Sequence, residues 1–300
     1  MTARTVERIG NVFADAGCTG WLHARRLDDG AAEISVGGDE LVVTASVYKL
    51  PLLIALVRCF DDGAIDPREQ IRVVPDDCTP GPTGVSIFRD PVTLSWRDLA
   101  ASMIAVSDNA AADVILGRVG LDRVNDAMTQ LGLERTRVVG GTAEAQASLV
   151  RDTDSHTTAE AFAALASNDD AWTVAAYDAA YASATTARDM NRLLAALWSG
   201  NALSESGTEL AKALLHHQVW PHRIRSGFPH TGVAVAGKTG TVGIIRNEVA
   251  VVTFAGESPV AVAVFTRAAR ADPALPAVDA AIGEVARIAV TELRSGTVVD

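Results

Sequence analysis

The segment VVTASVYKLPLL, residues 42–53, is mostly apolar but places the hydroxyl of Ser46 three positions before the amine of Lys49. Residues three apart are neighbours on one face of a helix. A serine hydroxyl is a weak nucleophile, and a lysine that has lost its proton can activate it from hydrogen-bonding distance. The spacing alone is weak, because Ser-x-x-Lys is expected about once by chance in a chain of this length. Taken alone, Ser46 would be a helix cap.

Two further polar runs strengthen the chemical interpretation. VSDNAA places Ser107, Asp108 and Asn109 where one predicted helix ends and the next begins. AGKTGT, residues 236–241, places Lys238 on a predicted strand near the C-terminus. Each run has an ordinary structural explanation, as helix caps or as a strand end. Their occurrence together and in this order indicates a catalytic site built around Ser46.

The ordered set Ser-x-x-Lys, Ser-Asp-Asn and Lys-Thr-Gly resembles the signature of class A β-lactamases and of the wider penicillin-recognising serine hydrolases. The resemblance covers most of the chain, since ASVYKLPLL, VSDNAAADVIL and RNEVAVVTFAGESPVAVAVFTR are similar to the family's nucleophile helix, second motif and terminal strands. It implies a serine hydrolase that forms an acyl-enzyme with a β-lactam or another amide or ester. It also implies a two-lobed fold with the site in the cleft between the lobes.

The predicted catalytic residues are Ser46, Lys49, Ser107 and Lys238. Partial burial and a second cation, for which Lys238 is the candidate, would favour the neutral amine of Lys49. Ser107 could pass a proton to a leaving nitrogen or oxygen. The backbone N–H groups of Ser46 and Thr241 would hold the developing oxyanion.

The predicted substrate contacts come from the second motif and the C-terminal strands. Asn109 could orient Lys49 and a substrate amide, while Lys238, Thr239 and Arg246 could donate to a substrate carboxylate, a group that a guanidinium fits well. The full predicted set is Asn109, Thr239, Gly240, Thr241, Arg246 and, because some family members carry their arginine there, Arg223.

The resemblance fails between residues 138 and 158. Class A β-lactamases carry there a Glu-x-x-Leu-Asn loop, whose glutamate activates the deacylating water, and this chain lacks the pattern. The loop looks shortened and rich in Gly and Ala. Glu144 is the candidate deacylation base, although an ordinary solvated loop carboxylate describes it better. Without a placed base, acylation can proceed while hydrolysis of the acyl-enzyme becomes slow.

Three functions therefore stay open. The first is a serine hydrolase, with or without β-lactamase activity. The second is a penicillin-binding or sensor-type protein that is acylated without turnover. The third is an acyltransferase, which shares the acyl-enzyme with a hydrolase and passes the acyl group to an amine.

The elements that must position these residues follow from the apolar periodicity. Strand-like runs occur at both ends of the chain and helical runs fill the middle. The sequence predicts an α/β fold of the α+β type, with an antiparallel sheet assembled from both ends, helices on its faces and an inserted all-helical lobe. The predicted boundaries are 1–45 and 188–300 for the sheet lobe and 46–187 for the helical lobe. Pro51 needs a small irregularity near the start of the nucleophile helix.

Composition narrows the partners. The chain has 300 residues and a formal net charge of -11, which argues against a nucleic-acid surface. No apolar run approaches the roughly 20 residues of a membrane span, and no His/Cys cluster predicts a metal or another cofactor. Three cysteines and the lack of a recognisable secretory signal favour reduced thiols and a cytoplasmic location. The expected partner is a small molecule, with a carboxylate, and the sequence does not indicate an oligomeric state.

Overall fold

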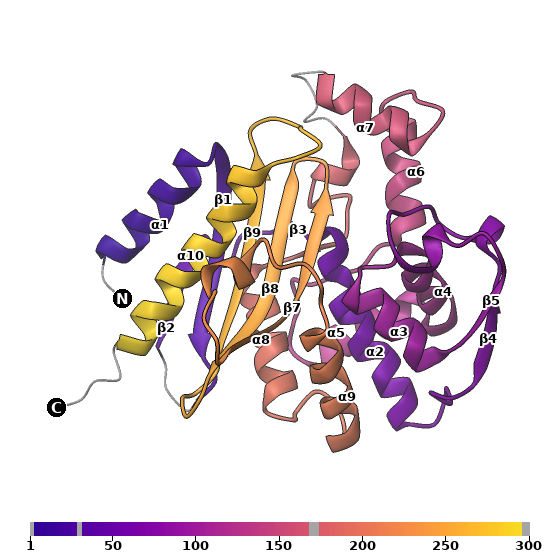
Figure 1. Ribbon diagram of the computed structural model, residues 1–300, viewed down its shortest axis with the longest axis horizontal. Coiled ribbons are helices and arrows are strands. Elements are labelled where there is room, and N and C mark those ends of the chain that lie inside the picture. Colours follow the sequence, from indigo (N-terminus) through magenta and orange to yellow (C-terminus); the bar gives the residue numbers. More distant parts are fainter. Residues whose placement is uncertain (1–2, 29–31, 168–173, 296–300) are drawn as a thin grey trace.

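The computed structural model describes residues 3–28, 32–167 and 174–295, and Figure 1 shows their arrangement. The main sheet has the strand order β2-β1-β9-β8-β7, and all of its pairings are antiparallel. Its strands are β1 (Cys18–Arg26), β2 (Glu33–Val36), β7 (Val233–Val242), β8 (Ile245–Phe254) and β9 (Val260–Ala268). Because β1 pairs with β9, the predicted sheet assembled from both ends of the chain is confirmed.

Helices cover both faces of this sheet (Figure 1). The N-terminal α1 (Ala3–Asp15) and the C-terminal α10 (Pro276–Ser295) pack on one face, and α8 (Ala187–Trp198) contacts β1, β8 and β9 from the other. Successive strand residues point to opposite faces. In β8, Val249 therefore packs in the core shared with α8, while Ala250 packs in the core shared with α10.

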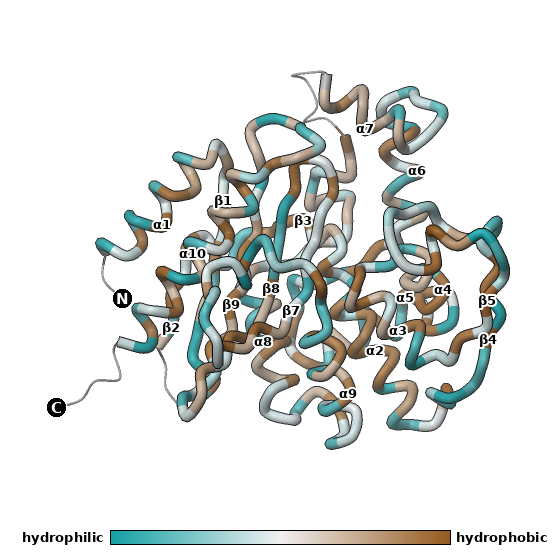
Figure 2. Tube along the Cα trace, viewed as in Figure 1, coloured by the Kyte–Doolittle hydropathy of each residue, from teal (hydrophilic) through white to brown (hydrophobic). Residues whose placement is uncertain are grey.

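The middle of the chain is helical, as predicted. Its helices are α2 (Lys49–Asp61), α3 (Trp96–Ala105), α4 (Asn109–Val119), α5 (Leu121–Gln130), α6 (Thr142–Asp152), α7 (Thr158–Ser167) and α9 (Glu205–His216). The helix α2 lies at the centre, and ten of its 13 residues are buried. A helix that is apolar on all sides belongs in a core. Figure 2 shows the same concentration of hydrophobic residues along α2 and the central strands.

Short elements complete the frame. Two ribbons pair β3 (Val42–Val43) with β6 (Ala184–Thr185), and β4 (Gln70–Val73) with β5 (Val92–Ser95). The 3₁₀ helices are η1 (Ala45–Tyr48), η2 (Pro75–Asp77), η3 (Gly84–Ile87), η5 (Ala175–Tyr177) and η6 (Ile224–Gly227). The irregularity expected from Pro51 is η1, which leads into α2. Pro51 is the third residue of α2, where a backbone N–H would have no partner within the helix.

None of the helices in the described ranges has both the length and the apolar character that a membrane span requires. The cytoplasmic location and the lobe boundaries at 45/46 and 187/188 stay predictions.

Candidate active site

Ser46 lies in η1, directly after the short strand β3. The buried side chain of Asn247 on β8 fixes this entry, because its Nδ2 donates to the carbonyls of Val43 at 2.8 Å and Thr44 at 3.1 Å. Ala45 has a φ of 45°, an uncommon value for a residue with a side chain. Ser46 therefore follows a residue with a strained backbone. The hydrogen bonds from Asn247 hold the segment that leads to it.

The strand β7 passes against η1 at Gly240. A Cβ built at Gly240 would lie 2.6 Å from the carbonyl oxygen of Thr44 and 3.1 Å from the backbone nitrogen of Val47. Any side chain would push the strand away from the nucleophile segment. Gly240 thus has a packing reason to be glycine, and its predicted substrate contact stays a prediction.

Lys49 begins α2, and its backbone N–H donates to the carbonyl of Ser46, which places the two residues one turn apart. The Lys49 side chain is fully buried. Its Nζ donates to the carbonyls of Ser107 at 2.7 Å and Asp108 at 3.3 Å, and to Oδ1 of Asn109 at 2.9 Å. The second motif therefore reaches the base of the first, as the sequence predicts.

The third motif joins the same group through Ser107. Nζ of Lys238 lies 2.9 Å from Oγ of Ser107 and 2.8 Å from the carbonyl of Thr239, and Oγ of Ser107 lies 3.4 Å from Nζ of Lys49. Ser107 has a φ of 62°, which marks a second strained backbone position. Within the described residues the Ser46 hydroxyl has no hydrogen-bond partner, although catalytic hydrogen bonds often form only in the substrate complex.

Burial lowers the pKa of both lysines. Burial lowers the pKa of Lys49 to about 7, against the opposing effect of the carboxylates of Asp108 and Asp113. Burial also lowers the pKa of Lys238 well below its usual range, and the nearby charges of Lys49 and Arg223 lower it further. We expected partial burial and a second cation to depress the pKa of Lys49. Burial is the main cause, and the repulsion between the amines contributes at Lys238.

Asp108 supports the site through its side chain. As the N-cap of α4 it accepts from the backbone N–H of Ala111, and it also accepts from Val85 N at 2.6 Å, Ser86 Oγ at 3.1 Å and Ser102 Oγ at 2.7 Å. The helix-cap explanation therefore holds for Asp108. Its carboxylate thereby holds the segment that carries Ser107 in place.

Arg223 is 2% exposed and stabilises the C-terminal strands. Its guanidinium donates to the carbonyls of Gly240 and Asn247, both at 2.8 Å, to Oγ1 of Thr241 at 2.7 Å, and to Oδ1 of Asp279 at 2.6 Å. Arg223 donates to the Thr241 side chain and lines the cavity that contains Ser46, and its contact with a substrate carboxylate stays a prediction.

Arg246 has its guanidinium directed to backbone oxygens. It donates to the carbonyls of Gly243, Ile245 at 3.1 Å and Asp272 at 3.4 Å, and only 4% of the residue is exposed. Arg246 lines the same cavity, but its hydrogen bonds hold the turn between β7 and β8. Of the two predicted arginines, Arg223 has the closer link to the predicted oxyanion residue, Thr241.

The Gly- and Ala-rich segment that we expected to be a loop contains the helix α6, and α7 follows it. Its shortening relative to class A β-lactamases stays a prediction. Alanine-rich segments are strong helix formers. Glu144 lies in the first turn of α6, is exposed, and accepts from the backbone N–H of Gly141 at 2.8 Å. The carboxylate proposed as a deacylation base therefore serves as part of the N-terminal cap of α6.

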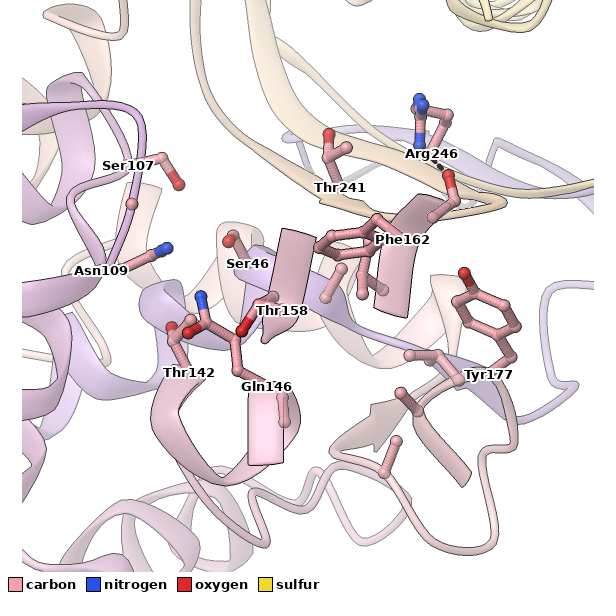
Figure 3. A pocket seen from close by; sticks show the side chains of 18 of the residues that line it. Ser46, Ser107, Asn109, Thr142, Gln146, Thr158, Phe162, Tyr177, Thr241 and Arg246 are labelled. Carbon is pink, nitrogen blue, oxygen red and sulfur yellow. Dashed lines mark hydrogen bonds between the residues drawn. The ribbon is translucent and has the colours of Figure 1, made fainter. Parts of the chain in front are cut away.

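Gln146 on α6 was not predicted as a site residue. Figure 3 shows it beside Ser46, with Asn109 on the other side. Its Nε2 donates to the carbonyl of Pro80 at 3.0 Å, and Nδ2 of Asn109 donates to the same oxygen at 3.2 Å. A carboxamide of α6 thus lines the cavity that contains Ser46 and shares the carbonyl of Pro80 with Asn109.

A buried carboxamide–carboxylate pair behind β7 was also missed. Gln218 accepts from the backbone N–H of Thr239 at 2.6 Å and donates to Oε1 of Glu248 at 2.9 Å. Glu248 also accepts from Ile224 N at 2.5 Å, and burial raises its pKa to about 7. The polar residues 246–248 (RNE) at the start of the otherwise apolar strand β8 could have indicated this pair. This pair holds the strand that carries Lys238.

The exposed part of the site is a cavity of about 1410 Å³ (Figure 3). The predicted site residues that line it are Ser46, Ser107, Asn109, Glu144, Arg223, Thr239, Thr241 and Arg246. Lys49 and Lys238 lie behind its wall, fully buried, and reach the cavity through Ser107.

Comparisons with known proteins identify relatives that match almost the whole chain. A relative from Streptomyces cacaoi, the β-lactamase regulatory protein BlaB, is 29% identical over 297 residues, which cover 94% of this chain and 95% of that protein. The crystal structure of a β-lactamase from Sphaerobacter thermophilus matches with a TM-score of 0.79 at 24% identity, covering 98% of this chain and 99% of that one.

The penicillin-binding protein PBP-A has a similar fold, with a TM-score of 0.76 at 21% identity and coverage of 98% of this chain and 97% of its own. A sequence model of the β-lactamase enzyme family matches residues 4–293, which include all three motifs. The chain therefore belongs to the β-lactamase enzyme family.

Proposed function

We propose that this protein forms an acyl-enzyme on Ser46 with a β-lactam or another amide or ester, and that it deacylates slowly. The observation that carries the proposal is the Ser107 hydroxyl, which lies 3.4 Å from one buried lysine and 2.9 Å from the other, beside the nucleophile. Two buried amines around one hydroxyl can pass a proton along this group.

In the acylation step, Oγ of Ser46 bonds to the substrate carbonyl carbon and its proton passes to the amine of Lys49. A pKa of about 7 lets Lys49 accept a proton at neutral pH and release it again. The bond from the carbonyl carbon to the leaving nitrogen or oxygen then breaks. The leaving atom takes a proton from the Ser107 hydroxyl, which regains one from the neighbouring amines.

Substrate binding is assigned to the groups around Ser46. The backbone N–H groups of Ser46 and Thr241 stabilise the oxyanion. Asn109 holds a substrate amide. The hydroxyls of Thr239 and Thr241, supported by Arg223, bind a substrate carboxylate. Arg246 is given a lesser part in this set, because its guanidinium donates to backbone carbonyls.

Slow deacylation follows from the side of the cavity formed by α6. The carboxylate of Glu144 caps the helix, and Gln146 of the same helix lines the cavity that contains Ser46 (Figure 3). An amide oxygen can accept a hydrogen bond from water but does not take its proton at neutral pH. Among the described residues, the acyl-enzyme then has no free carboxylate on the α6 side of the cavity to act as a general base for hydrolysis.

A regulatory role is the second candidate, supported by the likeness to the β-lactamase regulatory protein BlaB of Streptomyces cacaoi. A protein that holds its acyl group for a long time is suited to report that a β-lactam is present. Transfer to an amine uses the same intermediate and stays an alternative.

The test is turnover of a chromogenic cephalosporin and of a short-chain aryl ester by the wild-type protein and by Ser46→Ala. A fast release of about one equivalent of product followed by slow turnover, absent in Ser46→Ala, supports a slow acyl-enzyme. Rapid steady turnover supports a hydrolase with a base that the proposal does not contain. Product release that survives in Ser46→Ala would overturn the assignment of the nucleophile.

A further inference from the structure

The cavity extends well past Ser46, into a space formed by α6, α7 and η5. Ligand cavities commonly measure roughly 300–1,000 Å³, and this one, at about 1410 Å³, is larger. We call this extension the apolar annex, defined by the lining residues Val139, Ala159, Phe162, Ala163, Leu165 and Tyr181. Figure 3 shows Phe162 directed into the cavity between Ser46 and Tyr177.

Large apolar side chains of the annex face open space. Val139 is 45% exposed, Phe162 37% and Tyr181 71%, although all three line one cavity. Exposed apolar side chains gathered in one concave place indicate a binding site. Scattered exposed residues would need no such explanation.

Charged side chains that line the same cavity already have partners. Arg246 donates to backbone carbonyls, Asp279 accepts from Arg223 at 2.6 Å, and Arg151 lies 3.7 Å from its neighbour Asp152. The annex therefore offers apolar surface and few free charges to a ligand.

The direction of the acyl group follows from the position of Ser107. The leaving atom must lie near the Ser107 hydroxyl to receive its proton, so the leaving group occupies that side of Ser46. Figure 3 shows Ser107 and Phe162 on opposite sides of Ser46. The acyl substituent therefore points along the end of β7, past Thr241 and Val242, toward the annex.

We propose that the annex binds a long, uncharged aliphatic or aromatic chain on the acyl side of the substrate, so that the preferred substrates are lipophilic acyl esters or amides. The inference rests on the acyl-enzyme proposed above. In the reaction, Oγ of Ser46 bonds to the acyl carbon, the ester C–O bond breaks, and the alcohol leaves with the proton from the serine. Water later releases the fatty acid and restores the hydroxyl.

The test is a series of 4-nitrophenyl esters from acetate to decanoate, held below their micelle concentrations, with the second-order rate of acylation read from the release of nitrophenolate. Burial of one methylene corresponds to an increase of about fourfold in this rate, and we expect such steps from butanoate to octanoate. A flat series in the wild type would overturn the annex. If neither an ester of this series nor a cephalosporin acylates Ser46, the proposed function itself fails.

A matched pair of variants localises the effect. Ala163→Trp fills the annex from α7, and it should lower the ratio of the octanoate rate to the acetate rate at least tenfold. Ala147→Trp adds the same side chain at an exposed position of α6 that does not line the cavity, and it should keep the wild-type ratio. An unchanged ratio in folded Ala163→Trp, or an equal fall in both variants, contradicts the annex.

Discussion

At the scale of single residues, the site depends on what surrounds two buried amines. Ser107 accepts a hydrogen bond from Lys238 and lies within hydrogen-bonding distance of Lys49. Asp108, the next residue, caps the N-terminus of α4 and so fixes the backbone beside Ser107. The hydroxyl of Ser107 therefore couples the first and third motifs. Complete burial lowers the pKa of both lysines, that of Lys49 to about 7.

The pH dependence of acylation tests the role of Lys49. Its pKa is about 7, so the neutral amine is present above this value and lost below it. We expect the acylation rate to rise through pH 7 and to fall about tenfold per pH unit in more acidic solution. Burial also raises the pKa of Glu248 to about 7. Glu248→Gln is therefore the control, and it should leave the midpoint in place. A midpoint that vanishes in this variant would assign the titration to Glu248.

Gln146→Glu tests the cause of slow deacylation. A carboxylate beside Ser46 could take a proton from the hydrolytic water, and general base catalysis typically contributes about 10²–10⁴-fold. We expect faster steady-state hydrolysis with an acylation rate close to that of the wild type. Gln146→Ala removes the hydrogen bond to Pro80 without adding a base, and it should not accelerate hydrolysis. Equal acceleration in both variants would mean that Gln146 merely blocks water.

At the scale of elements, the close contact of β7 with η1 sets the geometry. Gly240→Ala would place a Cβ 2.6 Å from the carbonyl oxygen of Thr44. We expect it to lower the free energy of unfolding by about 1–3 kcal/mol and to slow acylation, because Thr241 moves away from Ser46. Gly117→Ala in α4 meets open space and should stabilise the protein by about 1 kcal/mol. Urea unfolding and the acylation rate check both variants, and wild-type acylation in Gly240→Ala would contradict this account.

The sequence predicted the strands and central helices well because their apolar residues follow clear periods. It missed α6 because Leu149 is the buried residue that this helix contributes, so no apolar period marks it. Its start is fixed from a distance: both oxygens of Asp113 on α4 accept from the first backbone N–H groups of α6, at 2.7 Å from Thr142 and 2.9 Å from Ala143. A local pattern does not contain such a contact.

The site residues divide in the same way. The three motifs identified Lys49, Ser107 and Lys238, whose contacts in the fold join segments 58 and 131 positions apart. Gln146 was missed because a glutamine in a polar stretch carries no signal until the fold places it beside the nucleophile. The helix α6 was missed for a related reason, since a family pattern that is absent says nothing about what replaces it.

At the scale of the whole molecule, the two predicted lobes share one core. A single cluster of buried side chains runs from Leu53 and Leu56 of α2 to Val249, Ala261 and Phe265 of the sheet. The strands at the two ends of the chain also pair with each other. Neither half can therefore keep its apolar surface buried without the other.

We expect one cooperative unfolding transition in urea, with coincident midpoints from near-ultraviolet circular dichroism and from tryptophan fluorescence. Tryptophans lie in both predicted lobes, Trp96 on α3 and Trp21 on β1, so both signals depend on both lobes. Two separate midpoints would show that the lobes unfold independently.

The measurement that tests the account most directly is the intact mass of the protein after incubation with penicillin G, followed by peptide mapping of the adduct. The account predicts an increase of one penicillin G per chain, located on Ser46, which persists for many minutes and does not form in Ser46→Ala. No adduct together with no hydrolysis, or an adduct on a different residue, would contradict it.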